Sequence, residues 1–274
     1  MAEPRLQPLP FTEAIQALKA RDRERLPSGH WSSVWEAEHA VAFTVARSSG
    51  FDILSDIHES LTKALSEGTT FETWKKDITP VLQAKGWWGK REIDGELVQL
   101  GSPRRLATIF QVNMRVSYMA GKWEQIQRLK DRRPWLRYVA VLDERTRANH
   151  RSLHGTVLPV DHPFWDSHFP PNGWRCRCTV EQLSDRDLAR YGYRPTDPPP
   201  PVRLATWRRP ATGDIVVTPR GIDPGWGHNV GRARETAMTA LQKLETVPPV
   251  IAARAPAALP NLLPAAAGEF RTWA

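Results

Sequence analysis

The stretch DERTRANHRSLHGTVLPVDHPFWDSHFPPNGWRCRC, residues 143–178, holds both cysteines of the chain and four of its eight histidines. Thiolate sulfur and imidazole nitrogen are the ligands of tetrahedral zinc sites, and a closed structural site needs four of them. Because six such side chains fall within one short stretch, we take it as the centre from which the rest of the sequence is interpreted.

Two pairs within this stretch have spacings that place their side chains on a common face. His150 and His154 are four residues apart, which on a helix puts both imidazoles on one side. Cys176 and Cys178 are two residues apart, which on a strand does the same for the sulfurs. The PPNG turn at 170–173 can fold one pair over the other, because proline presets φ and Asn-Gly tolerates positive φ.

We therefore predict one structural zinc with ligands His150, His168, Cys176 and Cys178. His168 is preferred as the fourth ligand because it lies beside the turn that leads into the cysteines, and the alternates are His154 and Asp143. A competing interpretation is a metal-free, hydrogen-bonded cluster in which the C-x-C pair is a chance pair of small buried residues. A disulfide between cysteines one residue apart is not expected in a reducing compartment.

Several long motifs run through the same stretch and beyond it. They are D-x-R-T-R-x-x-H at 143–150, H-P-F-W-D at 162–166, and F-P-P-N-G-W at 169–174 followed by C-R-C. These motifs resemble the phage Mu F-like head morphogenesis family. Further matching segments extend the resemblance over most of residues 30–235: AFTVA at 42–46, ALSEGTTF at 64–71, GWWG at 86–89, IFQVN at 109–113 and GIDPGW at 221–226.

The resemblance implies a minor head protein of a tailed double-stranded DNA phage or prophage, acting in capsid assembly near the portal. The implied partners are the portal protein and other capsid components. The implied location is the virion, in the capsid interior or close to the portal, after synthesis in the host bacterial cytoplasm. No enzymatic activity is implied, and the residues after 235 are expected to be too few and too featureless for the toxin domain that some relatives carry.

The composition predicts well-packed modules joined by extended segments, since 274 residues suffice for one large or two modest domains and 24 of them are proline. The first residues, MAEPRLQPLPF, lack the apolar segment of a signal peptide. No run of about 18 uncharged apolar residues occurs, so we expect no membrane span.

The pattern of apolar residues predicts an α+β fold in four parts. They are an N-terminal arm over 1–30, a helical assembly domain over 31–133, a mixed α+β module with short strands over 134–235, and a terminal helix end with an extended Pro/Ala-rich tail over 236–274. Helices are predicted over 11–25, 31–47, 52–68, 70–86 with an interruption at Pro80, 103–132, 184–191 and 231–245. Strands are predicted over 137–142, 156–160, 178–183, 203–207 and 214–218, with a hairpin over 90–101.

The formal charge of +8 and a pI near 9.8 favour a polyanionic neighbour. Residues 121–151 have a net charge of +5 and residues 201–234 a net charge of +4. We predict contacts with double-stranded DNA through its phosphates, independent of base sequence. Solvated helix faces are the alternative explanation of the charge. The candidate phosphate contacts are Arg128, Lys130, Arg132, Arg133, Arg208 and Arg209.

A metal-dependent nuclease or toxin-like enzyme using the His/Asp/Cys cluster is the competing function. Asp143, Asp161 and Asp166 lie close enough in sequence to help hold a catalytic ion with an open position for water. Two features argue against it. Cysteines suit a closed structural site, and no second carboxylate cluster supplies the oxygen ligands that Mg²⁺ prefers.

Overall fold

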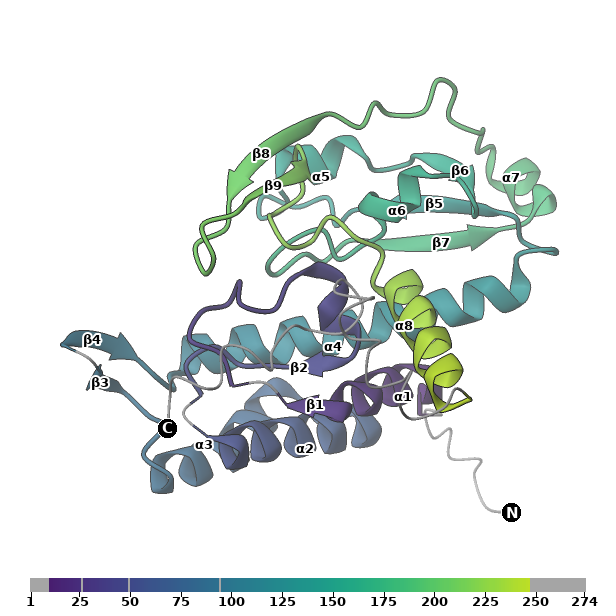
Figure 1. Ribbon diagram of the computed structural model, residues 1–274. Helices are drawn as coiled ribbons and strands as arrows, with labels where there is room; N and C mark the ends of the chain where they lie inside the picture. Colours follow the sequence, from purple (N-terminus) through teal and green to yellow (C-terminus); the bar gives the residue numbers. More distant parts are fainter. Residues whose placement is uncertain (1–9, 26, 49, 94, 247–274) are drawn as a thin grey trace, which may run out of the picture.

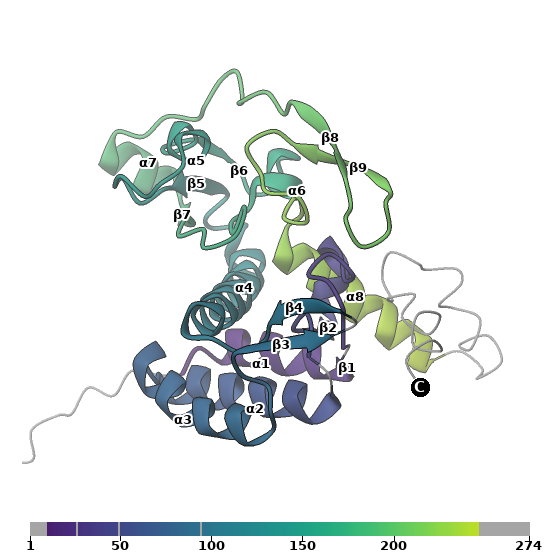
Figure 2. The ribbon, with the colours of Figure 1, turned by 90° about the vertical axis from the view of Figure 1, so that its left-hand side faces the viewer.

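The expected α+β fold is confirmed by a computed structural model, which describes residues 10–25, 27–48, 50–93 and 95–246 (Figure 1). Two large hydrophobic cores lie on either side of one long helix, α4 (Pro103–Leu129). A helical half lies on one side of α4 and a half built of short strands and helices lies on the other (Figure 2).

Helix α4 begins where the sequence predicts it. The Ser102 side chain accepts a hydrogen bond from the backbone N–H of Arg105, and Pro103 occupies the first helical position. The N-terminal part of α4 contributes Leu106 and Ile109 to one core. Its C-terminal part contributes residues to the other core: Met119, Ala120, Trp123 and Ile126.

Three further helices and a hairpin form the helical half, and their apolar stripes pack against each other and against α4. Thr70 caps α3 through the N–H of Thr73, and Gly68 ends α2 at a φ of 68°, a conformation that glycine adopts without strain. The elements are α1 (Thr12–Ala20), α2 (Phe51–Glu67), α3 (Phe71–Ala84), β3 (Lys90–Ile93) and β4 (Glu96–Gln99).

Pro80 lies inside α3 without interrupting it, so the predicted break is wrong. Proline removes the N–H that would bond the carbonyl four residues earlier, which belongs to Lys76. Both residues are exposed, and water can satisfy that carbonyl. The helix therefore continues to Ala84.

The helix predicted over 31–47 is also wrong. This segment contains only a short 3₁₀ helix, η2 (Glu36–Ala40), and a two-residue strand, β2 (Ala42–Phe43), which pairs in parallel with β1 (Glu24–Arg25). Trp31 and Trp35 instead contact Trp207, with ring centroids 5.7 and 5.5 Å apart. Packing of the two indoles against Trp207 stabilises this segment more than the α-helix that the spacing of Val34, Val41 and Val45 would favour.

The helix of the predicted N-terminal arm belongs to the core. Helix α1 packs along α4 and buries Ala14, Ala17 and Leu18. At the other end of the described chain, α8 (Val230–Glu245) also packs against α4. The extended parts predicted at 1–9 and 247–274 lie outside the described residues.

The second half contains the predicted strands. A three-stranded antiparallel sheet has the order β6–β5–β7, in which Leu136 faces Leu158 on one side and Gln182 on the other. The elements are β5 (Trp135–Val139), α5 (Ala148–Ser152), β6 (Val157–Pro159), α6 (Phe164–His168), β7 (Thr179–Leu183), α7 (Asp185–Tyr191), β8 (Leu204–Arg208) and β9 (Ile215–Pro219).

The two halves share a core across the boundary predicted near 133–134. Leu136 and Tyr138 of the sheet are buried in the same cluster as Met119 and Trp123 of α4. Among the described residues, no helix combines the length and the apolar composition that a membrane crossing requires.

We predict that Gly121→Ala destabilises the protein, because α1 and α4 touch at this position. A Cβ at Gly121 would lie 2.5 Å from the backbone nitrogen of Ala14. The forced separation should lower the free energy of unfolding by about 1–3 kcal/mol, more than the gain of about 1 kcal/mol in helix propensity. Chemical denaturation measures the change.

Gly29→Ala is the matched control, because a Cβ at Gly29 meets nothing within 4 Å. Its free energy of unfolding should stay within about 0.5 kcal/mol of the unaltered protein. A Gly121→Ala protein as stable as this control would show that α1 does not pack closely on α4.

Candidate metal centre

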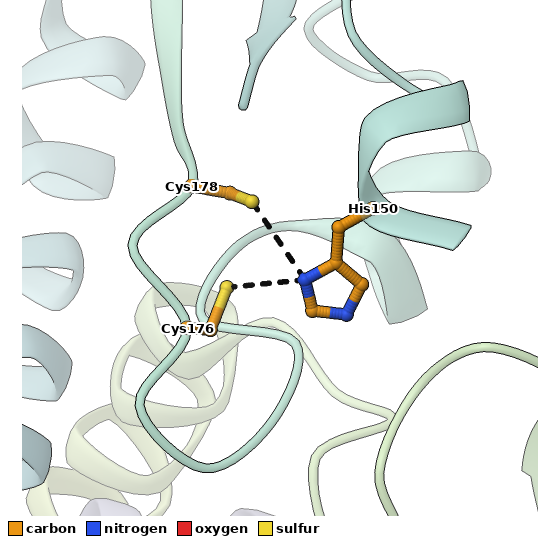
Figure 3. A group of neighbouring side chains, drawn as sticks. All are labelled: His150, Cys176 and Cys178. Carbon is orange, nitrogen blue, oxygen red and sulfur yellow. Dashed lines mark hydrogen bonds between the residues drawn. The ribbon is translucent and has the colours of Figure 1, made fainter. Parts of the chain in front are cut away.

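The structure brings three of the predicted ligands together, and all three side chains are buried (Figure 3). His150 lies on α5, and Cys176 and Cys178 lie just before β7. The Nδ1 atom of His150 is 3.6 Å from the sulfur of Cys176 and 3.7 Å from that of Cys178. The three potential ligand atoms lie within 4.8 Å of one another.

These distances fit a tetrahedral metal ion. Zinc bonds of about 2.3 Å to sulfur and about 2.0 Å to nitrogen place the two ligand atoms roughly 3.6 Å apart at a tetrahedral angle. The observed separations of 3.6 and 3.7 Å agree with that value. Two sulfurs and an imidazole are also a donor set that suits zinc.

A backbone carbonyl orients the imidazole of His150. Its Nε2 atom lies 3.2 Å from the carbonyl oxygen of Gly221, and a carbonyl can only accept, so Nε2 carries the proton. The lone pair of Nδ1 then points at the two sulfurs, as ligating histidines require. Gly221 has a φ of 91°, and a Cβ there would lie 2.9 Å from the Cβ of Asn149.

The two thiols do not ionise alike. Hydrogen bonds from the Cys178 thiol and from the backbone N–H of Asn172 hold the pKa of Cys176 below its usual range. The hydrogen bond to that neighbouring thiolate, together with burial, raises the pKa of Cys178. Cys176 is thus the more acidic of the two thiols, and a divalent metal would allow both sulfurs to ionise.

Tyr138 and Asn172 support the sulfurs, and the sequence interpretation missed this role. The Tyr138 hydroxyl donates to the Asn172 side-chain oxygen over 2.8 Å, and both residues are fully buried. Burial raises the pKa of Tyr138, which keeps its hydroxyl a donor. The sequence indicates Asn172 only as a turn former, and a tyrosine in a strand has no local signal for this contact.

His168, the predicted fourth ligand, is not part of the group. Its ring stacks on Phe164 with centroids 4.4 Å apart, and its Nδ1 atom lies 2.8 Å from the Ser167 hydroxyl. Burial lowers the pKa of His168 to about 4. As positioned, His168 is a neutral core side chain of α6.

The two alternates are bound elsewhere. His154 accepts the backbone N–H of Ala140 at Nδ1 over 3.1 Å, and its Nε2 atom lies 3.2 Å from Arg137. Asp143 accepts two hydrogen bonds from Arg177, of 2.7 and 2.5 Å, which hold the pKa of the carboxyl well below its usual range. Because Arg177 lies between the cysteines, this pair anchors the C-R-C segment.

The carboxylates that a nuclease would need are not at the group. Asp161 lies 3.4 Å from Lys130, and Asp166 pairs with Arg232. In the described part of the chain, the only group able to hold a metal is that of His150, Cys176 and Cys178, which contains no carboxylate. The arrangement therefore favours a structural site over hydrolytic chemistry.

Most of the predicted phosphate contacts are engaged within the protein. Arg128 pairs with Glu13, Lys130 with Asp161, and Arg133 with Asp187. Arg209 donates to the carbonyls of Ser32 and Ser33, each over 2.7 Å, and lies over the ring of Trp35. Arg132 and Arg208 are exposed and form no ion pair with any described residue, and Arg208 donates one hydrogen bond, of 2.7 Å, to the carbonyl of Gly213.

Residues 55–181, which include the three potential ligands, match the family model described as Phage Mu protein F like protein. The chain belongs to this family, as the sequence motifs indicated. It is 41% identical over 191 residues to the "Putative capsid assembly protein F" of Escherichia phage Mu, a match covering 68% of this chain and 43% of that relative.

The chain is also 36% identical over 233 residues to the "Mu-like prophage FluMu F protein" of Haemophilus influenzae, covering 80% of this chain and 56% of that relative. The chain therefore spans about half the length of the curated relatives it matches. No solved structure matches it.

Proposed function

We propose that this chain acts in head morphogenesis of a tailed double-stranded DNA phage or prophage, as a minor capsid component near the portal. The observation that carries the proposal is the 41% identity, over 68% of the chain, to a relative whose name describes capsid assembly. The role is structural and needs no catalytic residue. The buried sulfur and imidazole group, with no carboxylate among its members, supports this.

Disrupting the coding sequence in the phage or prophage that carries it should abolish infectious virions while leaving induction and lysis intact. Electron microscopy of the lysate should show heads that are absent or aberrant, and expression of the full chain in trans should restore them. A tagged full chain should also co-purify with the portal protein. Normal virion yield after disruption would contradict the proposal.

The second part of the proposal is that His150, Cys176 and Cys178 bind one structural zinc. The ion would join α5 to the segment before β7, whereas the Asp143–Arg177 pair connects that segment to the loop that precedes α5. Structural zinc contributes on the order of 10 kcal/mol of apparent binding free energy in small domains. Water or His168 would supply the fourth ligand of the zinc ion. His168 would first have to leave its contacts with Phe164 and Ser167.

Elemental analysis of the untagged full chain should find close to one zinc per molecule. Cys176→Ser should lose the metal and lower the melting temperature, because a hydroxyl is a poor zinc ligand at neutral pH. His154→Gln is the matched control and should keep the metal, since the His154 imidazole lies outside the group and accepts the backbone N–H of Ala140.

X-ray absorption at the zinc edge should show two sulfur neighbours. Comparison with His168→Gln identifies the fourth ligand, because only a ligating His168 changes the number of nitrogen neighbours. A protein that is metal-free and equally stable with or without chelator would leave the hydrogen-bonded cluster as the correct description.

The third part is that packaged DNA is contacted through its phosphates, without base recognition. The net charge of +8 supports this, and Arg132 and Arg208 are the candidates left exposed and without an acidic partner among the described residues. The other four are engaged in the contacts described above, so fewer phosphates are neutralised than the sequence alone suggests.

Affinity for duplex DNA should fall with salt by about 0.9 log units per log unit of salt for each phosphate neutralised. Replacing Arg132 and Arg208 together by Gln should reduce this slope by about 1.8. Lys63→Gln, on the exposed surface of α2 in the helical half, is the control and should leave the slope unchanged. Affinity that does not depend on salt would exclude phosphate contact.

A further inference from the structure

A cavity of about 70 Å³ lies where the two halves meet, between α1, α4, α8 and the segment 31–40. Its walls are mostly apolar and aromatic, and three of its four indole rings are half-buried at its edge. The apolar and aromatic lining residues are Ala17, Trp31, Val34, Trp35, Ala40, Val112, Val116, Ala120, Trp174, Trp226 and Val230.

Arg21 places a charge in this apolar wall. The residue is only 6% exposed, and its Nε and Nη1 atoms have no hydrogen-bond partner in the part of the chain that the structure describes. Its guanidinium carbon lies 5.6 Å from the centroid of Phe43, and the neighbouring Asp22 contacts His58 instead. Burial lowers the pKa of Arg21 to about 10, so the side chain stays charged at neutral pH.

No carboxylate lines the cavity to balance this charge. Arg234, the other lining arginine, has its own partner, because its Nη1 atom donates to Glu124 over 3.1 Å. Burial lowers the pKa of His39 to about 3 and that of His228 to about 4, so both imidazoles are neutral. Arg21 is therefore the uncompensated charge among the lining residues.

Three further polar atoms of the lining residues are also unpaired in the described part of the chain: Nε of Arg234, the Ser117 hydroxyl oxygen and Nδ1 of His228. The Ser117 hydroxyl on α4 is buried, with the residue 1% exposed, and the Nδ1 atom of His228 is buried as well; neither has a partner among the described residues. A buried polar group without a hydrogen bond costs about 1–3 kcal/mol, and a buried unpaired charge costs more. A bound anion with oxygen acceptors would relieve both costs.

We propose that this cavity binds the carboxylate of a small apolar acid, with Arg21 as the charge partner and Ser117 as a hydrogen-bond donor. The acid can be free, or it can be the side chain of a glutamate or aspartate in a partner protein. An arginine and a carboxylate form strong charge-assisted hydrogen bonds, and the aromatic walls accept the carbon atoms of the acid.

The size and the lining exclude larger or more highly charged ligands. The cavity is about half the volume of the roughly 150 Å³ space that admits benzene, so a nucleotide does not fit. A phosphate dianion needs more donors than one arginine and one hydroxyl supply. This inference is independent of the metal site and of the head-assembly role, because none of the lining residues belongs to the metal group.

The test is titration of the full chain with propionate at constant ionic strength, followed by tryptophan fluorescence. The four indole rings at the cavity report directly on its occupancy. Propionate should give a saturable change, and propionamide, its neutral analogue of the same shape, should give none. Inorganic phosphate should bind at least tenfold more weakly than propionate, and stronger binding of phosphate would overturn the assignment.

Arg21→Met should weaken propionate binding at least tenfold without lowering the melting temperature, because the unpaired nitrogens contribute no hydrogen bonds to stability. Arg186→Met, on the exposed surface of α7, is the matched control and should bind as the unaltered protein does. Ser117→Ala provides a second readout if Arg21→Met does not fold, and it should weaken binding severalfold.

A short peptide that contains one glutamate with a free side-chain carboxylate, and whose two termini are blocked, separates the two sources of the carboxylate. Binding of this peptide more tightly than propionate points to a partner protein, and the reverse order points to a free acid; both results support a carboxylate site. No saturable response to either probe, or unchanged binding in both Arg21→Met and Ser117→Ala, would overturn the inference.

Discussion

Both large hydrophobic cores are completed by α4, and this double burial is the constraint on which the rest of the structure depends. Leu106 and Ile109 fill one core near its start, while Trp123 and Ile126 fill the other near its end. Neither half can bury its apolar surface without this helix. The same dependence brings α1 and α8 onto α4, so segments from both ends of the described chain meet there and enclose the cavity beside Arg21.

The candidate metal-binding group of His150, Cys176 and Cys178 depends on this packing through the sheet. Tyr138 of β5 lies in the core shared with α4 and holds Asn172, whose backbone N–H reaches the Cys176 sulfur. The Gly221 carbonyl fixes the imidazole of His150 from the opposite side. The potential ligands are thus oriented by hydrogen bonds before any ion binds, which is the arrangement expected of a site that stabilises a fold.

Part of the basic character of the chain acts within the molecule. Arginines from the two positively charged windows bind carboxylates and carbonyls of other elements, as Arg209 does across 177 residues to Ser32. Such partly buried contacts position elements more than they attract nucleic acid.

The sequence by itself determined the family, the α+β class and most helix and strand positions, including the caps at Thr70, Ser102 and Ser184. These signals act over a few residues, so local physics decides them. It also identified His150, Cys176 and Cys178 by their chemistry. Only the tertiary structure decided that His168 lies outside the group, that residues 31–47 form no α-helix, and that Arg21 is buried without an acidic partner among the described residues. Each depends on contacts between residues far apart in sequence, whose packing energies exceed local preference.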